Sequence, residues 1–163
     1  MNGSDRVAVI ISATTVQEGL AQLIISHLSR SDSKTHDELF GVEGPLSTFS
    51  NLIRIAYAMG LVTVAMKTDL NSIRRIRNVF AHGLRPLAVS EPEIHLEINR
   101  LRLHGQVTAE EQTLFEQMDG KSKFVVCCLS ISSECLNRTS ARYAKLTRTM
   151  TAYLDLMKQR DGK

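Results

Sequence analysis

The densest group of residues that could do chemistry lies between positions 74 and 85. It combines four permanent cations, one titratable ring and one amide. These residues are Arg74, Arg75, Arg77, Asn78, His82 and Arg85. Guanidinium groups bind phosphate and carboxylate oxygens through paired hydrogen bonds, and histidine exchanges a proton near neutral pH. The cluster therefore indicates either anion binding or acid–base chemistry on a phosphodiester.

Arg77 is expected to differ from its neighbours in its position on a helix. On a helical wheel it falls in the apolar arc between Ile73 and Ala81, whereas Arg74 and Arg75 face the polar, solvated side. A buried guanidinium without a partner is costly, so Arg77 should either pair across the core or line a cleft. The sequence thus predicts that Arg77→Ala loses more stability than the same change at the other two. The candidate carboxylates are Glu43, Asp69 and Glu97.

His82 has two interpretations because it directly precedes the helix-ending Gly83. It could cap the last carbonyls of the helix and interact with the helix dipole, which is a structural role. It could instead act with Arg77 on a substrate. Five residues apart, the two side chains diverge by about 140° on a regular helix, so the ring would have to swing back over the helix end.

A second basic stripe, Arg138, Arg142 and Lys145, follows one face of the predicted terminal helix. Glu134 precedes Arg138 by one turn and offers an ordinary surface ion pair. A solvated face and contacts with phosphate groups both remain open for this stripe.

The cysteines at 127, 128 and 135 are odd in number and lie in one segment, which favours reduced, buried thiols. No further ligands lie at metal-binding spacing, so we predict no metal and no cofactor.

Helical periodicity, with few Gly, Pro and aromatic residues, predicts an all-α bundle of about five to seven helices with a long C-terminal helix. We expect one domain over residues 1–163. Ser90 with Glu93 and Thr108 with Glu111 have the spacing of capping boxes. The expected helices cover residues 5–30, 46–59, 68–82 or 69–82, about 91–103, about 109–118 and 121–159.

Composition sets the broad class. The 163 residues have a net charge of +3, which is too mild for a protein that coats nucleic acid or carries a polybasic membrane anchor. The apolar run Val7–Ile11 is far shorter than a bilayer span, so we expect a cytoplasmic protein without a membrane partner. In the helix predicted at 46–59, one side carries Leu46, Phe49, Leu52, Ile53, Ala56 and Tyr57. This helix is apolar around much of its circumference and the terminal helix is too long for one small bundle to cover, which predicts a homodimer.

The middle of the chain resembles the mannitol operon repressor family. The resemblance rests on four segments in order: residues 44–50 (Gly-Pro-Leu-Ser-Thr-Phe-Ser), 53–61 (Ile-Arg-Ile-Ala-Tyr-Ala-Met-Gly-Leu), 69–71 (Asp-Leu-Asn) and 73–82 (Ile-Arg-Arg-Ile-Arg-Asn-Val-Phe-Ala-His). It implies an all-helical bacterial transcriptional regulator of mannitol use without an obvious helix-turn-helix. The residues expected to bind nucleic acid or a partner protein are Arg54, Arg74, Arg75, Arg85, Arg138, Arg142 and Lys145.

The same segment at 77–82 resembles the Arg, polar residue, then His signature of HEPN domains, many of which are metal-independent dimeric ribonucleases. This resemblance implies that Arg77 steadies the scissile phosphate, Asn78 orients it and His82 acts as general base or acid.

The leading interpretation is a regulator that acts through a partner protein or weak nucleic-acid contacts, and the alternative is a HEPN-type ribonuclease. An interaction module that binds no nucleic acid is a third hypothesis. Exposure of His82 in a cleft between subunits is expected only for the ribonuclease.

Overall fold

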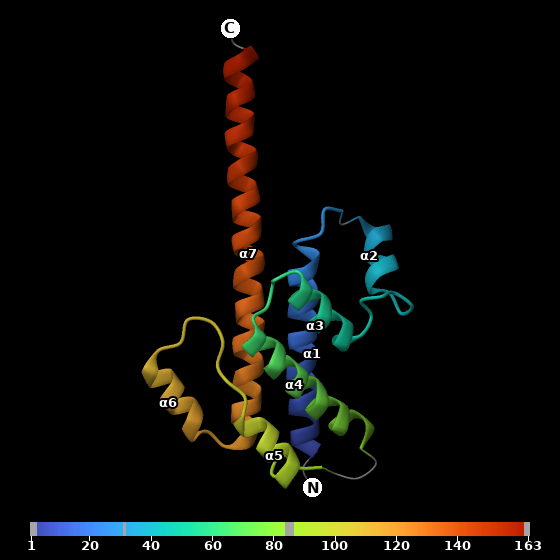
Figure 1. Cartoon of the computed structure of the whole chain (residues 1–163), viewed down its shortest axis with the longest axis vertical. Helices are drawn as coiled ribbons and strands as arrows, with labels where there is room; N and C mark the ends of the chain where they lie inside the picture. The colour runs from blue at the N-terminus through green and yellow to red at the C-terminus, as the bar shows by residue number, and fades with distance from the viewer. Residues whose placement is uncertain (1–2, 31, 84–86, 162–163) are drawn as a thin grey trace.

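The computed structural model describes residues 3–30, 32–83 and 87–161, and this part of the chain is helical without strands. It confirms the all-α fold with a long C-terminal helix (Figure 1). The helices are α1 (Gly3–Ile25), α2 (Ser33–Phe40), α3 (Phe49–Ala58), α4 (Val64–His82), α5 (Pro92–Asn99), α6 (Ala109–Gln117) and α7 (Gly120–Asp161).

Two long helices, α1 and α7, lie side by side at the centre of the molecule and run in the same direction (Figure 1). Lys121 Nζ lies 3.3 Å from Asp5 Oδ1 near the start of both helices. Fourteen residues further along each helix, Gly19 packs against Cys135. The two helices therefore stay in constant register over this length. The core residues that α1 supplies are Val9, Ala13, Val16, Leu20, Leu23 and Ile24.

By length and composition alone, the stretch Asp5–Ile25 could cross a membrane, although Val7–Ile11 by itself is short. In the fold, one side of this helix is buried in the hydrophobic core against α3, α4 and α7. The cytoplasmic location stays a prediction.

Helix α3 crosses α1, and its predicted apolar face is largely confirmed because Phe49, Leu52, Ile53 and Ala56 are buried. Tyr57 is the exception: its ring is 38% exposed and lies under the ammonium of Lys67 at 3.8 Å. A cation–π contact at the surface therefore replaces core packing at this position.

Helix α4 starts earlier than the sequence predicted, at Val64 rather than at Thr68 or Asp69. The reason is that Thr63 is the N-cap, and its Oγ1 accepts from Met66 N at 3.2 Å. Thr68 instead lies inside the helix and donates to Val64 O at 2.9 Å. The predicted end before Gly83 is confirmed.

The two expected capping boxes have opposite outcomes. Thr108 and Glu111 form the complete box at the start of α6, as predicted. Glu91 occupies the N-cap of α5, its side chain does not cap the helix N-terminus, and Pro92 lies in the first turn, so the box expected from Ser90 and Glu93 is wrong. A proline in the first turn fixes the backbone there without a cap.

Two helices also end earlier than expected. Helix α1 ends at Ile25 rather than near residue 30, and α5 ends at Asn99 rather than near Leu103.

Candidate functional site

The three residues of the 77–82 segment lie on α4 at or near the surface. Arg77 and Asn78 are half-buried and His82 is exposed. Arg77 Nη1 donates to Asn78 Oδ1 at 3.2 Å. Of the two predicted roles of Arg77, pairing across the core is wrong, because Arg77 lies at the border of the buried face of α4. That face consists of Met66, Asp69, Leu70, Ser72, Ile73, Ile76 and Phe80. The other role of Arg77, lining a cleft, stays a prediction.

The carboxylates proposed as partners of Arg77 are engaged elsewhere or exposed. Arg75 Nη2 donates to Glu97 Oε2 at 2.9 Å. The prediction that Arg75 is simply solvated is therefore wrong, because its guanidinium forms an ion pair. Hydrogen bonds from Arg75 and Ser72 lower the pKa of Glu97. Glu43 is exposed in the connection between α2 and α3. Arg77 therefore forms no ion pair with a described carboxylate.

His82 forms no hydrogen bond with a described residue. The carbonyl before it, Ala81 O, is capped by Arg6 Nη2 from α1 at 3.0 Å, and Gly83 N donates to Val79 O at 2.9 Å. Two of the last carbonyls of α4 are thus satisfied without the imidazole. The ring is also not hydrogen bonded to Arg77, so α4 presents these two side chains separately, about 140° apart around the helix.

The remaining basic candidates in the described part of the chain are dispersed over three helices. Arg54 is exposed on α3, and Arg74 is half-buried on α4. On α7, Arg142 is half-buried and Lys145 is exposed. Arg85 lies outside the described residues.

Arg138 has a structural role. Its Nε donates to Glu134 Oε1 at 2.6 Å, which is the expected pair one turn away, and its Nη1 donates to Leu61 O at 2.9 Å. The second bond ties α7 to the connection between α3 and α4. Arg138 is therefore a weaker candidate for phosphate binding than the sequence suggested.

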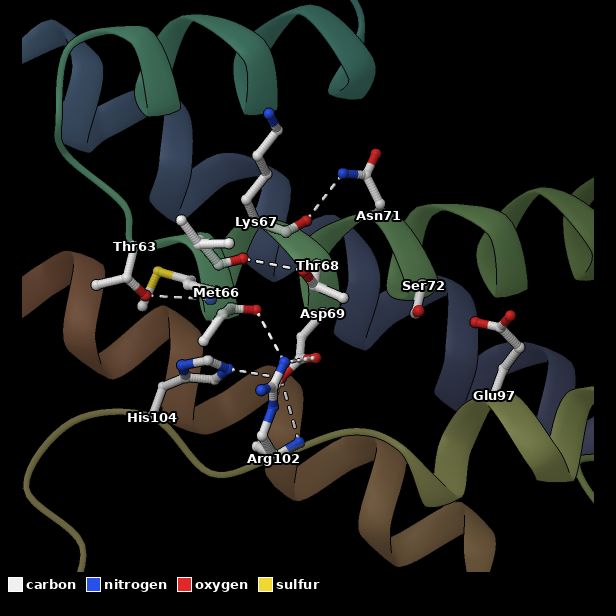
Figure 2. Close-up of polar contacts among 12 residues, drawn as sticks. Thr63, Met66, Lys67, Thr68, Asp69, Asn71, Ser72, Glu97, Arg102 and His104 are labelled. Carbon is white, nitrogen blue, oxygen red and sulfur yellow. Dashed lines mark hydrogen bonds and ion pairs between the residues drawn. The ribbon is translucent and has the colours of Figure 1, made fainter.

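A second polar cluster on α4 points inward and was not predicted. Asp69 has a side chain that is only 2% exposed, and two residues of the α5–α6 connection converge on it (Figure 2). Arg102 Nη2 donates to Asp69 Oδ1 at 3.0 Å, and Arg102 N donates to Oδ2 at 3.2 Å. His104 Nε2 lies 2.8 Å from the same Oδ2. The cluster fixes the α5–α6 connection to α4.

The charge state of this cluster follows from its surroundings. Burial raises the pKa of Asp69, but hydrogen bonds from His104 and Arg102 outweigh burial, so the pKa lies below its ordinary value. The carboxylate is ionised at neutral pH, and His104 Nε2 then donates the hydrogen bond. Asp69 stood out in the sequence only as an N-cap or a partner of Arg77. Arg102 and His104 lie in a connection without helical periodicity, so no pattern pointed to them.

His104 also lines an open groove of about 660 Å³ between α6 and α7. A histidine held by a buried aspartate is the arrangement of a general base. The neighbouring hydroxyl is not free to serve as nucleophile, because Ser130 Oγ donates to Cys127 O at 2.8 Å and accepts from His104 N at 3.2 Å. These contacts support a structural role for Asp69 and His104.

Within the described residues, no group of three or more His, Cys, Asp or Glu side chains could hold a metal ion.

A comparison of this chain with protein-family models, curated proteins and solved structures gives no match.

We expect Arg77→Ala to lower the free energy of unfolding by less than about 1 kcal/mol, because its guanidinium is at the surface border and has no ion-pair partner to strand. This reverses the sequence-based expectation. The denaturant midpoints of the wild type, Arg77→Ala and Arg74→Ala would check this expected loss. A loss of about 2 kcal/mol or more would mean that Arg77 has a partner in the core.

Proposed function

We propose that this protein is a bacterial transcriptional regulator of the mannitol operon repressor type, which acts through a partner protein or through weak contacts with nucleic acid. In this proposal it is a cytoplasmic homodimer without a cofactor. The family assignment is supported by the segments at 44–61 and 69–82. The function is supported by the exposed edge of α4, where Arg77 has no described carboxylate to neutralise it.

The edge of α4 combines features that suit a phosphate group. Arg74, Arg77, Asn78 and His82 are half-buried or exposed, and they spread over an arc of about 140° around the helix. An unpaired guanidinium beside an amide can donate several hydrogen bonds to phosphate oxygens. Because Arg77 forms no ion pair with a described carboxylate, it can bind a phosphate without first breaking such a pair. Such contacts position a nucleic acid without reading its bases.

The same helix is unsuited to reading a sequence in the major groove. In a helix-turn-helix, the first turns of the second helix contact base edges. In α4 these turns carry Met66 and Asp69, both buried in the fold. The regulator is therefore proposed to bind nucleic acid without strong sequence preference, or to rely on a protein partner for its target.

The test is a titration of labelled duplex DNA and single-stranded RNA by fluorescence anisotropy at about 50 and 200 mM salt. For about three phosphate contacts, we expect this rise in salt to weaken binding by about 40-fold, because a slope of about −0.9 applies per contact. Arg77→Gln should weaken binding, and Lys34→Gln is the matched control because Lys34 is an exposed cation on α2. Tight binding to one operator that survives the higher salt would contradict the proposal.

A HEPN-type ribonuclease is the second proposal, and it is supported by the exposure of His82. The ring is not used to cap α4, so it is available to exchange a proton with a ribose hydroxyl or a leaving oxygen. Arg77 would then hold the phosphate and Asn78 would orient it.

Incubation of purified protein with single-stranded RNA and a chelator separates the two proposals. The ribonuclease requires cleavage that falls by about 10²- to 10⁴-fold in His82→Ala, with stability unchanged. Cleavage that persists in both His82→Ala and Asn78→Ala would point to a contaminant. Absence of cleavage by the wild type favours the regulator.

A further inference from the structure

Helix α7 continues well beyond the helix that covers it. Because α1 and α7 keep the register set by Asp5 with Lys121 and Gly19 with Cys135, the end of α1 at Ile25 lies level with about residue 141 of α7. Helix α7 continues to Asp161, which is about 20 residues or about 30 Å further. Figure 1 shows this part of α7 standing clear of the other helices.

An apolar stripe follows α7 on a face that the fold leaves open. Leu129, Leu136 and Tyr143 are 56%, 65% and 52% exposed. They are spaced by seven residues and so lie on one side of the helix. The face of α7 that packs in the core is different, and its buried residues are Phe124, Cys127, Cys128, Ile131 and Cys135. The stripe is therefore additional to the core.

The sequence extends this stripe along the projecting part of the helix. Met150 and Met157 continue the seven-residue spacing, and Leu146 and Tyr153 follow Tyr143 and Met150 by three residues. Alternating steps of three and four between apolar residues define positions a and d of a coiled coil. We call these residues the α7 seam: Leu129, Leu136, Tyr143, Leu146, Met150, Tyr153 and Met157.

We propose that the α7 seam pairs with the same seam of a second copy of this chain. A heptad stripe is complementary to another stripe of the same kind, and the chain itself offers a partner of matching length and spacing. Beside the body of the molecule this face is narrow, because Ser132 of α7 lies against Gly19 of α1 and Ser133 lines the groove beside α6. The second copy is therefore proposed to pair mainly along the projecting part of α7, with Leu129 and Leu136 at the edge of the contact. This inference rests on the homodimer of the proposed function and names the surface that forms it, whereas the nucleic-acid contacts of α4 are tested separately.

The area of the seam is sufficient for a stable dimer. Burial of a tyrosine removes about 150–250 Å² from water, and a leucine or methionine contributes about 60–120 Å² at 25 cal/mol/Å². Because Leu129, Leu136 and Tyr143 are only 56%, 65% and 52% exposed, the seven seam residues then bury about 480–890 Å² per partner, and the upper part of this range reaches the roughly 800 Å² of a standard interface. The pairing also supports the helix itself, because the projecting segment contains Thr147, Thr149 and Thr151, which are weak helix formers.

Light scattering on the full chain at micromolar concentration tests this inference. The wild type should have a mass close to twice the 18.2 kDa of the chain. Met150→Glu, which places a charge in the seam, should weaken the dimer on the order of 100-fold or more. Ala144→Glu is the matched control, because it adds the same charge to an exposed position of α7 one residue outside the seam.

Three results would overturn the inference: a wild type that stays monomeric, equal dissociation by Met150→Glu and Ala144→Glu, or a dimer that survives Met150→Glu combined with Tyr143→Glu. Near-identical thermal unfolding of the monomeric body in both single variants would show that the fold is retained.

Discussion

Asp69→Asn is expected to lower the free energy of unfolding by about 3 kcal/mol. The change removes the charge that accepts hydrogen bonds from Arg102 and His104, and it leaves their donors facing a neutral amide. Loss of one member of a buried pair costs about 3–5 kcal/mol. We expect the lower end, because the Arg102 side chain is 49% exposed and water can compensate its charge.

Urea unfolding at neutral pH measures this loss, with Glu97→Gln as the control. Glu97 also accepts from an arginine, Arg75, but the pair is nearer the surface and should be worth no more than about 1 kcal/mol. Equal losses in the two variants would show that burial of Asp69 does not strengthen its cluster.

The same cluster predicts a dependence of stability on acid. Because the pKa of Asp69 is lowered in the folded protein, the folded state binds a proton less readily than the unfolded state does. The stabilisation is fully present above the unfolded pKa of about 3.9 and is lost as the pH falls through the folded pKa. The gap between wild type and Asp69→Asn should therefore shrink below about pH 4. A gap that stays constant down to acid pH would contradict this assignment.

The second large effect is expected for the three buried thiols of α7, which are free cysteines. Burial raises the pKa of Cys127 to about 12 and that of Cys135 to about 11, and it also raises the pKa of Cys128. The thiolate is the reactive form. At about pH 8, the fraction of a cysteine that is present as thiolate is about 0.2 for an ordinary thiol and on the order of 10⁻³ for a thiol with a pKa of about 11.

Alkylation by iodoacetamide, followed by mass spectrometry, should thus be at least about 100-fold slower in the folded protein than in urea. Limited access to the core adds to the effect of the pKa. If one of these cysteines reacted in the folded protein as fast as in urea, that segment of α7 would have to open frequently.

Patterns that depend on neighbours in the sequence predicted the local structure well. The helical periodicity of Phe49, Leu52, Ile53 and Ala56 identified the buried face of α3, because side chains three and four apart share a face in any helix. The Thr108–Glu111 box formed because both partners lie within one turn. The pair of Glu134 with Arg138 formed for the same reason.

The sequence did not determine which charges meet across the fold. Several carboxylates were within reach of a long arginine side chain, and only the docking of the helices selected among them. Asp69 pairs with Arg102, 33 residues away, and Glu97 pairs with Arg75. Arg77 therefore remains at the surface, although its position on the helical wheel suggested burial. The wheel gives only the direction of a side chain, whereas burial depends on which neighbouring helix covers that direction. Here the tertiary structure decided that α4 turns its aspartate inward and Arg77 toward solvent.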